Sequence, residues 1–203
     1  MKKISDSIPG YAYGGVGVAK SPLSMAEFAE LKISAGFTEA DERYLRMAGE
    51  VLSSQTRQIV EHWRSGIIAN LPHLGRHSRT PEGKPLPEYL AKSNLRFEQW
   101  ILDTCLRPYD GNWTNYQQEI ALRHMIPKKN QTDGVCSTPY VPFRDILAFV
   151  ATMNETIKPY LAAKGHAAEQ VEKMHLAWCK SIQLQMALWG GAYCSSPPES
   201  SQW

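Results

Sequence analysis

Apolar side chains recur along most of this chain with the three-and-four spacing of an α-helix. The longest such pattern runs from Thr38 to about Ala69. Residues at positions i, i+3, i+4 and i+7 share one face of a helix, so the pattern predicts a single long helix over this range. Its predicted buried stripe consists of Leu45, Ala48, Leu52, Ile59, Trp63 and Ile67.

Other segments follow the same rule, and two helix starts carry their own signal. Ser21-Pro22 with Ser24 precedes the first helix, and Thr38 with Asp41 forms a capping-box arrangement before the second. The Pro- and Gly-rich stretch Leu71–Pro87 predicts a surface loop. The remaining helices are predicted over 25–33, 88–105, 112–125, 143–161 and 169–188, with a polar connection over 128–140.

Strand signals are nearly absent, because no alternating apolar run stands between turn residues. The sequence therefore predicts one all-α domain over residues 1–203. Residues 1–20, rich in Gly and Tyr, predict an irregular arm, and residues 195–203 predict a flexible tail. About six to eight helices with unequal connections fit a globin-like packing as well as a helix bundle.

Composition and charge narrow the class of protein. The 203 residues are 43% hydrophobic and 21% charged, with a net charge of +2. This is ordinary globular composition, and no basic stripe or charge block indicates a nucleic-acid or membrane partner. Residues 1–20 hold no apolar run of the kind found in a signal peptide or membrane span. We expect a cytoplasmic protein.

The cysteines carry no metal motif. Cys105, Cys136, Cys179 and Cys194 lie far apart, without the spacing of a zinc site, an iron–sulfur cluster or covalent haem attachment. We expect them to be buried free thiols in a reducing compartment.

Of six histidines, His124 is the candidate for chemistry. It falls on one stripe with Trp113, Tyr116 and Ile120, and Pro127 follows soon after, so a helix should end beside it. An inward-facing histidine at a helix end could ligate haem iron. A lone histidine on an apolar face is more often a hydrogen-bonded core residue, and spacing alone leaves both interpretations open. His73 and His77, in the predicted loop, are expected to be exposed.

Several segments resemble the protoglobins, single-domain haem proteins related to the sensor domains of globin-coupled sensors. The most specific block is Leu122-Arg123-His124 with Lys128-Lys129-Asn130-Gln131-Thr132-Asp133, which contains the family's proximal histidine. The resemblance extends over about residues 8–193. Its other segments are Ile8-Pro9-Gly10-Tyr11, Ala48-Gly49-Glu50-Val51-Leu52, Trp100-Ile101-Leu102-Asp103-Thr104, Tyr116-Gln117, Lys158-Pro159, Lys164-Gly165 and Leu188-Trp189.

The resemblance implies a fold, a cofactor and site residues. The fold would be an expanded globin, a three-over-three helical sandwich with an extra N-terminal helix and arm. The cofactor would be haem b, with His124 as its axial ligand and metal-binding residue. Trp63 matches a distal tryptophan, and Phe97 and Phe149 match aromatic residues that line the haem pocket. All three would be plain core residues in a protein without a cofactor.

The sequence departs from the family on the distal side. Protoglobins usually carry Trp-Tyr there, whereas Arg64 follows Trp63 in this chain. One extra residue before Pro72 makes Ser65 an alternative occupant of the tyrosine position. An arginine turned inward would be a permanent cation for polarised oxygen or anionic ligands, and one turned outward would leave an apolar pocket.

The resemblance also bears on Met125 and on the residues that could bind the haem propionates. Met125 replaces a second histidine of the family, and we expect it to point away from the iron. The candidate partners for the haem propionates are Arg76, His77 and Arg96.

The leading functional hypothesis is a haem protein that reversibly binds oxygen, carbon monoxide or nitric oxide. One alternative is a haem enzyme with peroxidase-like, nitrite or nitric oxide chemistry. Another is a gas sensor acting through a separate partner protein, because no output domain is expected in this chain. The last helix, with Trp178 and Trp189, could form a homodimer face. A haem-free helical domain is disfavoured by the match around His124.

Overall fold

The computed structural model describes residues 8–194, and within that range the chain forms helices joined by turns. The only strand-like pairing in this part of the chain is an isolated bridge between Arg79 and Pro85. The all-α prediction is therefore confirmed. Residues 8–20 of the predicted arm form turns, whereas residues 1–7 and the predicted tail, 195–203, lie outside the described residues.

The first two helices begin where the sequence signals place them. In α1 (Met25–Ser34), the Ser24 amide donates to Glu27 Oε2 at 2.8 Å, and the Glu27 amide donates to Ser24 Oγ at 3.3 Å. In α2 (Glu39–Leu52), Asp41 Oδ2 accepts from the Thr38 amide at 2.7 Å. Both contacts satisfy amides that the first turn of a helix leaves without a backbone partner.

The predicted helix over residues 38–69 is wrong as a single element, because the chain bends after Leu52. It resumes as α3 (Thr56–Glu61) and continues through a π-helical turn (His62–Ile67) and a 3-10 turn (Ile68–Asn70). Gln55 holds the bend, since its Nε2 donates to Val51 O at 3.0 Å and to Tyr160 O at 3.1 Å.

The predicted face of that segment is nevertheless correct. Five of the six stripe residues have no exposed surface, and Ile67 is half-buried. The bend preserves the apolar face and changes only the direction of the axis. The five fully buried residues are Leu45, Ala48, Leu52, Ile59 and Trp63.

The later helices lie close to their predicted bounds. The predicted loop contains a short helix, α4 (Pro72–Gly75), and a 3-10 turn (Arg76–Ser78). The last helix is longer than predicted, so Trp189 lies inside it. The long elements are α5 (Pro87–Leu106), α6 (Gly111–Arg123), α7 (Phe143–Leu161) and α8 (Ala168–Cys194).

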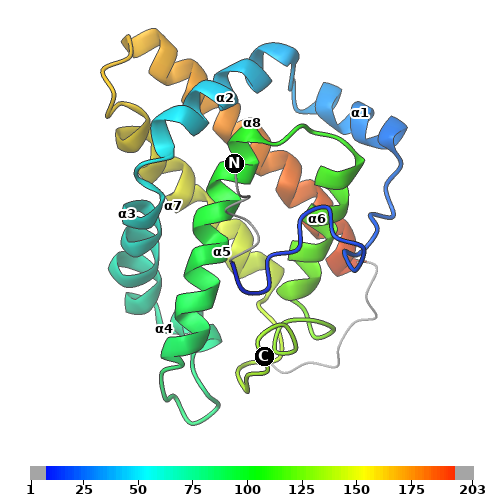
Figure 1. Ribbon diagram of the computed structural model, residues 1–203, viewed down its shortest axis with the longest axis vertical. Coiled ribbons are helices and arrows are strands. Elements are labelled where there is room, and N and C mark those ends of the chain that lie inside the picture. The colour runs from blue at the N-terminus through cyan, green and yellow to red at the C-terminus, as the bar shows by residue number, and fades with distance from the viewer. Residues whose placement is uncertain (1–7, 195–203) are drawn as a thin grey trace.

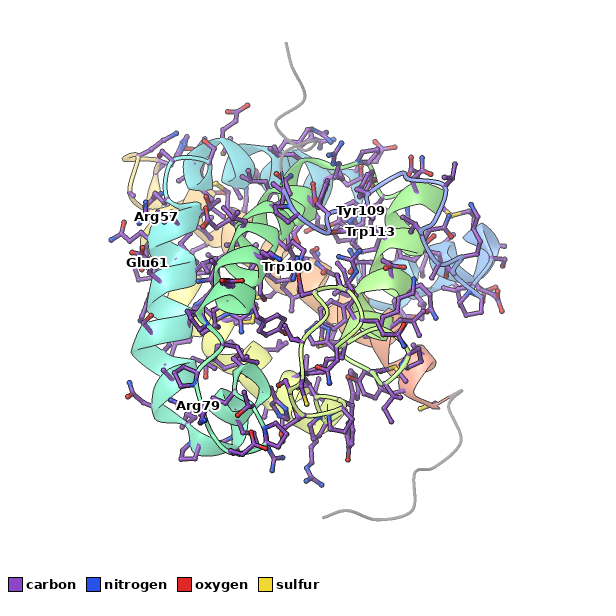
Figure 2. The ribbon with its side chains drawn as sticks, turned by 60° about the horizontal axis from the view of Figure 1, so that its bottom comes forward. Arg57, Glu61, Arg79, Trp100, Tyr109 and Trp113 are labelled. Atoms are coloured by element: carbon purple, nitrogen blue, oxygen red, sulfur yellow. The ribbon has the colours of Figure 1, made fainter. Side chains whose placement is uncertain are left out.

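Helix α8 is the centre of the packing. It contacts α2, α5, α6 and α7, while α2 also packs on α5 and α7, and α3 packs on α5 (Figure 1). Helix α1 lies at the edge of the molecule, away from α3 and α4 (Figure 1). Trp100 of α5 lies near the middle (Figure 2), where its Nε1 donates to Gln185 Oε1 of α8 at 2.7 Å.

The N-terminal arm packs across α5 and α6 (Figure 1). Tyr11 Oη donates to Asp103 Oδ2 of α5 at 2.7 Å. The Ala19 amide donates to Glu119 Oε2 of α6 at 3.0 Å. These bonds join residues about a hundred positions apart, so the arm is part of the folded structure from residue 8 onward.

Two expectations about buried residues are wrong. Trp178 and Trp189, suggested as a dimer face, are 0% and 5% exposed because they pack in the chain's own core. Cys136 and Cys194 are exposed free thiols rather than buried ones.

Asp41 is the residue of the α2 cap that matters most for stability, because it also accepts from Lys180 Nζ of α8 at 3.0 Å. We expect Asp41→Asn to lower the free energy of unfolding by about 1–3 kcal/mol. Urea unfolding measures this. The control Glu39→Gln, an exposed acid in the same turn, should change it by less than about 0.5 kcal/mol. Equal effects of the two substitutions would contradict the assignment.

Candidate functional site

A cavity of about 240 Å³ lies among α5, α6, α7, α8 and the segments before α5 and after α6. Most of its wall is apolar, with aliphatic side chains from α6, α7 and α8 and aromatic side chains from all four helices. Four basic and two acidic side chains also line it. These are Arg64, Arg96, Arg123 and Lys129, with Asp133 and Asp145.

His124 enters this cavity from the end of α6. The helix ends at Arg123, earlier than predicted, and the His124 amide donates to Ala121 O at 2.9 Å instead of to Ile120 O. The imidazole hydrogen-bonds to the Ile120 carbonyl in place of the backbone amide, with Nδ1 2.9 Å from Ile120 O. The ring stacks on Trp189 at 5.3 Å between centroids, and the Val141 amide donates to His124 O at 2.7 Å.

These contacts fix the protonation state of His124. A carbonyl oxygen can only accept, so Nδ1 must carry the proton, and Nε2 carries the lone pair. Burial lowers the pKa of His124 to about 4, the Ile120 carbonyl opposes this shift, and the charge of Arg64 adds to it. The ring is therefore neutral at pH 7. A neutral imidazole with its second nitrogen held by a carbonyl is the arrangement of metal-ligating histidines.

Phe97 and Phe149 line the cavity, as the resemblance implies. Trp63 does not line it. Its ring packs on Phe97 at 5.3 Å between centroids, and its Nε1 donates to Thr156 Oγ1 at 2.8 Å. Trp63 therefore supports Phe97 from behind.

Arg64, rather than Ser65, faces the cavity. Its Nη2 donates to Ser93 Oγ at 2.9 Å, and its Cζ lies 5.2 Å from the centroid of Phe97. Ser65 is exposed. Both residues lie in the π-helical turn, where each hydrogen bond spans one residue more than in an α-helix, so the turn can accommodate an extra residue.

Of the three predicted propionate partners, Arg96 and His77 line the cavity and Arg76 does not. Arg96 lines the cavity but is already paired, since its Nη2 lies 2.5 Å from Asp133 Oδ2 and its Nη1 donates to Pro9 O at 2.7 Å. His77 also lines the cavity. Arg76 is exposed and is not among the lining residues.

The prediction that His77 is exposed is wrong, because it is only 7% exposed. Its Nδ1 lies 2.6 Å from Thr138 Oγ1, and its Nε2, without a hydrogen bond, lies 3.9 Å from Asp145 Oδ2. A hydroxyl can donate or accept, so this contact does not fix the tautomer as the Ile120 carbonyl does for His124. Burial lowers the pKa of His77 to about 4.

Lys129 is a functional candidate that the sequence did not single out. It is 4% exposed, and its Nζ donates to His77 O at 3.2 Å and lies 3.4 Å from Ser137 Oγ. Burial lowers its pKa to about 8. Its only sequence signal was membership of the Lys128–Asp133 block. Tyr89 and Ser93 were also missed, although their spacing to Phe97 places them on one face of α5.

A family model described as Protoglobin matches residues 24–198. The chain belongs to the protoglobin family. The predicted expanded globin fold is thereby confirmed, and membership makes the protein a haem-binding globin. No curated protein matches the sequence. Within residues 8–194, no helix is both long and apolar enough to cross a membrane.

The residues of this protoglobin fit a haem. A flat apolar group suits the aromatic wall, and His124 offers an unprotonated nitrogen to the cavity. The two carboxylates of haem b suit a lining in which basic side chains outnumber acidic ones by two. Met125 is buried and does not line the cavity, as expected for a residue that points away from an iron.

The buried histidines predict how stability without haem depends on pH. Below an unfolded-state pKa of about 6.5 the unfolded chain binds protons that the folded chain refuses, so stability falls as pH drops from about 6.5 to 4. Replacing His77 by Gln should reduce this loss by about 2–3 kcal/mol, while His124 contributes equally to both proteins.

Urea unfolding of the haem-free protein between those pH values measures the effect. The control is His62→Gln, which removes an exposed histidine outside the cavity. The same slope in wild type and His77→Gln would contradict the burial of a neutral His77.

Proposed function

We propose that this protoglobin holds haem b through Nε2 of His124 and reversibly binds diatomic gases, namely oxygen, carbon monoxide or nitric oxide. The observation that carries the proposal is the hydrogen bond between His124 Nδ1 and Ile120 O. Because this bond holds the proton on Nδ1, the lone pair of Nε2 is free to bind iron. When bound, haem iron supplies a coordination position for a gas molecule.

The chain's own residues give this site its properties. Trp189 stacks on His124 and limits rotation of the ring. Phe97 and Phe149 provide apolar surface that disfavours water in the cavity, and Trp63 holds Phe97 in place. The apolar surface of Phe97 and Phe149 favours binding of small, weakly polar molecules over solvent.

We assign the haem carboxylates to the polar side of the cavity. Lys129 is the first candidate, because it is buried and, in the described part of the chain, forms no ion pair with an acid. Arg96 can contribute through the donors that Asp133 leaves open. A homodimer through α8 stays a prediction, and it would have to use exposed side chains such as Leu176.

The test is an absorption spectrum of the haem-reconstituted protein in its ferric, ferrous and carbonyl states. We expect the ferrous Soret band to shift with carbon monoxide. In His124→Gly, haem affinity should fall by about tenfold or more, and added imidazole should restore a wild-type spectrum by filling the vacated space.

The matched control is His62→Gly, which removes an exposed histidine outside the cavity. Its spectra should equal those of the wild type. Circular dichroism of the haem-free variants shows whether each is folded. A folded His124→Gly variant with an unchanged ferrous spectrum would rule out His124 as the ligand.

A further inference from the structure

Arg64 is a cation inside the protein without a counter-charge. Within residues 8–194, no Asp or Glu forms an ion pair with it. Its Nη2 donates to a neutral hydroxyl, that of Ser93, and its Nε is buried with no hydrogen-bond partner. A charge that burial strips of water and that has no partner is unfavourable in the folded state.

The charged groups around Arg64 do not supply the missing negative charge. The groups that affect it are Tyr89, which is neutral because burial raises its pKa, and Arg96, which is a second cation. The carboxylate nearest to Arg96, that of Asp133, is bound to the Arg96 guanidinium in a bidentate pair. The neighbourhood of Arg64 is therefore positive.

Arg64 lines the same cavity as His124. Its guanidinium lies over Phe97, whose ring packs on the fully buried Trp63. Its charge is also close enough to contribute to lowering the pKa of His124. Lys129 comes from the segment after α6 and also contributes to lowering the pKa of His124. Its Nζ, however, donates to His77 O and lies near Ser137 Oγ, whereas the Nε of Arg64 has no partner.

We propose that Arg64, with the hydroxyl of Ser93, forms a binding site for a small monovalent anion inside the cavity. Azide, nitrite and cyanide have the right charge and size. The free Nε and the Nη groups donate hydrogen bonds to the anion, and the aromatic wall excludes larger hydrated ions. Where the anion is also a ligand of haem iron, the inference rests on the proposed function.

The first experiment uses the haem-free protein, so it does not depend on the cofactor. Sodium azide replaces sodium chloride at constant ionic strength during urea unfolding. A ligand that binds only the folded state raises the midpoint as its concentration rises. We expect this rise in the wild type and its loss in Arg64→Met. No rise in the wild type, or the same rise in the variant, would overturn the proposal.

The second experiment titrates the ferric haem protein with azide and, separately, with neutral imidazole. Arg64→Met should weaken azide binding by about tenfold or more, because a hydrogen bond to a charged group is lost. Imidazole affinity should change by less than about threefold, and Arg64→Lys should retain most of the azide affinity. Equal loss of azide and imidazole would show a steric effect and contradict the proposal.

Two outcomes distinguish an anion site at Arg64 from a haem-carboxylate contact at Arg64 and from failure of the proposed function. If Arg64→Met releases haem faster to a competing apoprotein while azide affinity is unchanged, Arg64 holds a haem carboxylate and the anion site is refuted. If the protein takes up no haem, the proposed function fails, and the azide effect on the haem-free protein still decides the anion site.

The charge-matched control is Arg57→Gln, which removes a cation from the outer side of α3 (Figure 2), where Arg57 pairs with Glu61 at 3.0 Å. It changes net charge as Arg64→Met does, outside the cavity. Azide affinity in this variant should equal that of the wild type.

Discussion

The hydrogen bond from His124 Nδ1 to the carbonyl of Ile120 is the contact on which the site depends. It exists because α6 ends early. The last carbonyls of a helix lack backbone donors, and the His124 amide turns instead to Ala121. The same residue therefore ends the helix and uses the carbonyl that this ending frees. Its tautomer, its orientation and the availability of Nε2 all follow from that geometry.

The cavity around His124 combines features that are costly in a protein core. A void among apolar side chains loses packing contacts, and the buried Lys129 and the buried Nε of Arg64 lose hydration. A flat apolar cofactor with two carboxylates would fill the void and supply negative charge. The void and the charges are therefore explained together by the haem-binding property of the family, and neither is explained by a helical core alone.

The sequence predicted those features that depend on local patterns. Asp41 was found because its partner Thr38 lies three positions away, and Ser24 was found from the helix-start residues around it. The buried face of residues 45–63 followed from its periodicity. The bend at Gln55 could not be predicted, because Gln55 is held by Tyr160, which lies 105 positions away.

In the site, too, local patterns and family motifs were predicted, whereas features that depend on distant residues were not. His124 was identified from its stripe and the family block, and Phe97 and Phe149 were placed by resemblance. His77 was placed wrongly because its burial comes from Thr138 and Asp145, more than sixty positions later in the chain. The direction of Arg64 depends on the π-helical turn, and a pattern of apolar residues contains no signal for the extra residue that such a turn accommodates.

The most direct test of the account is a crystal structure of the haem-loaded protein. Two histidines line the cavity, and both are neutral at pH 7 because their pKa values are about 4. Only in His124 does a backbone carbonyl fix the proton on Nδ1. We predict iron on His124 Nε2 with the bond to Ile120 O intact. Iron bound by His77, or haem outside this cavity, would contradict it.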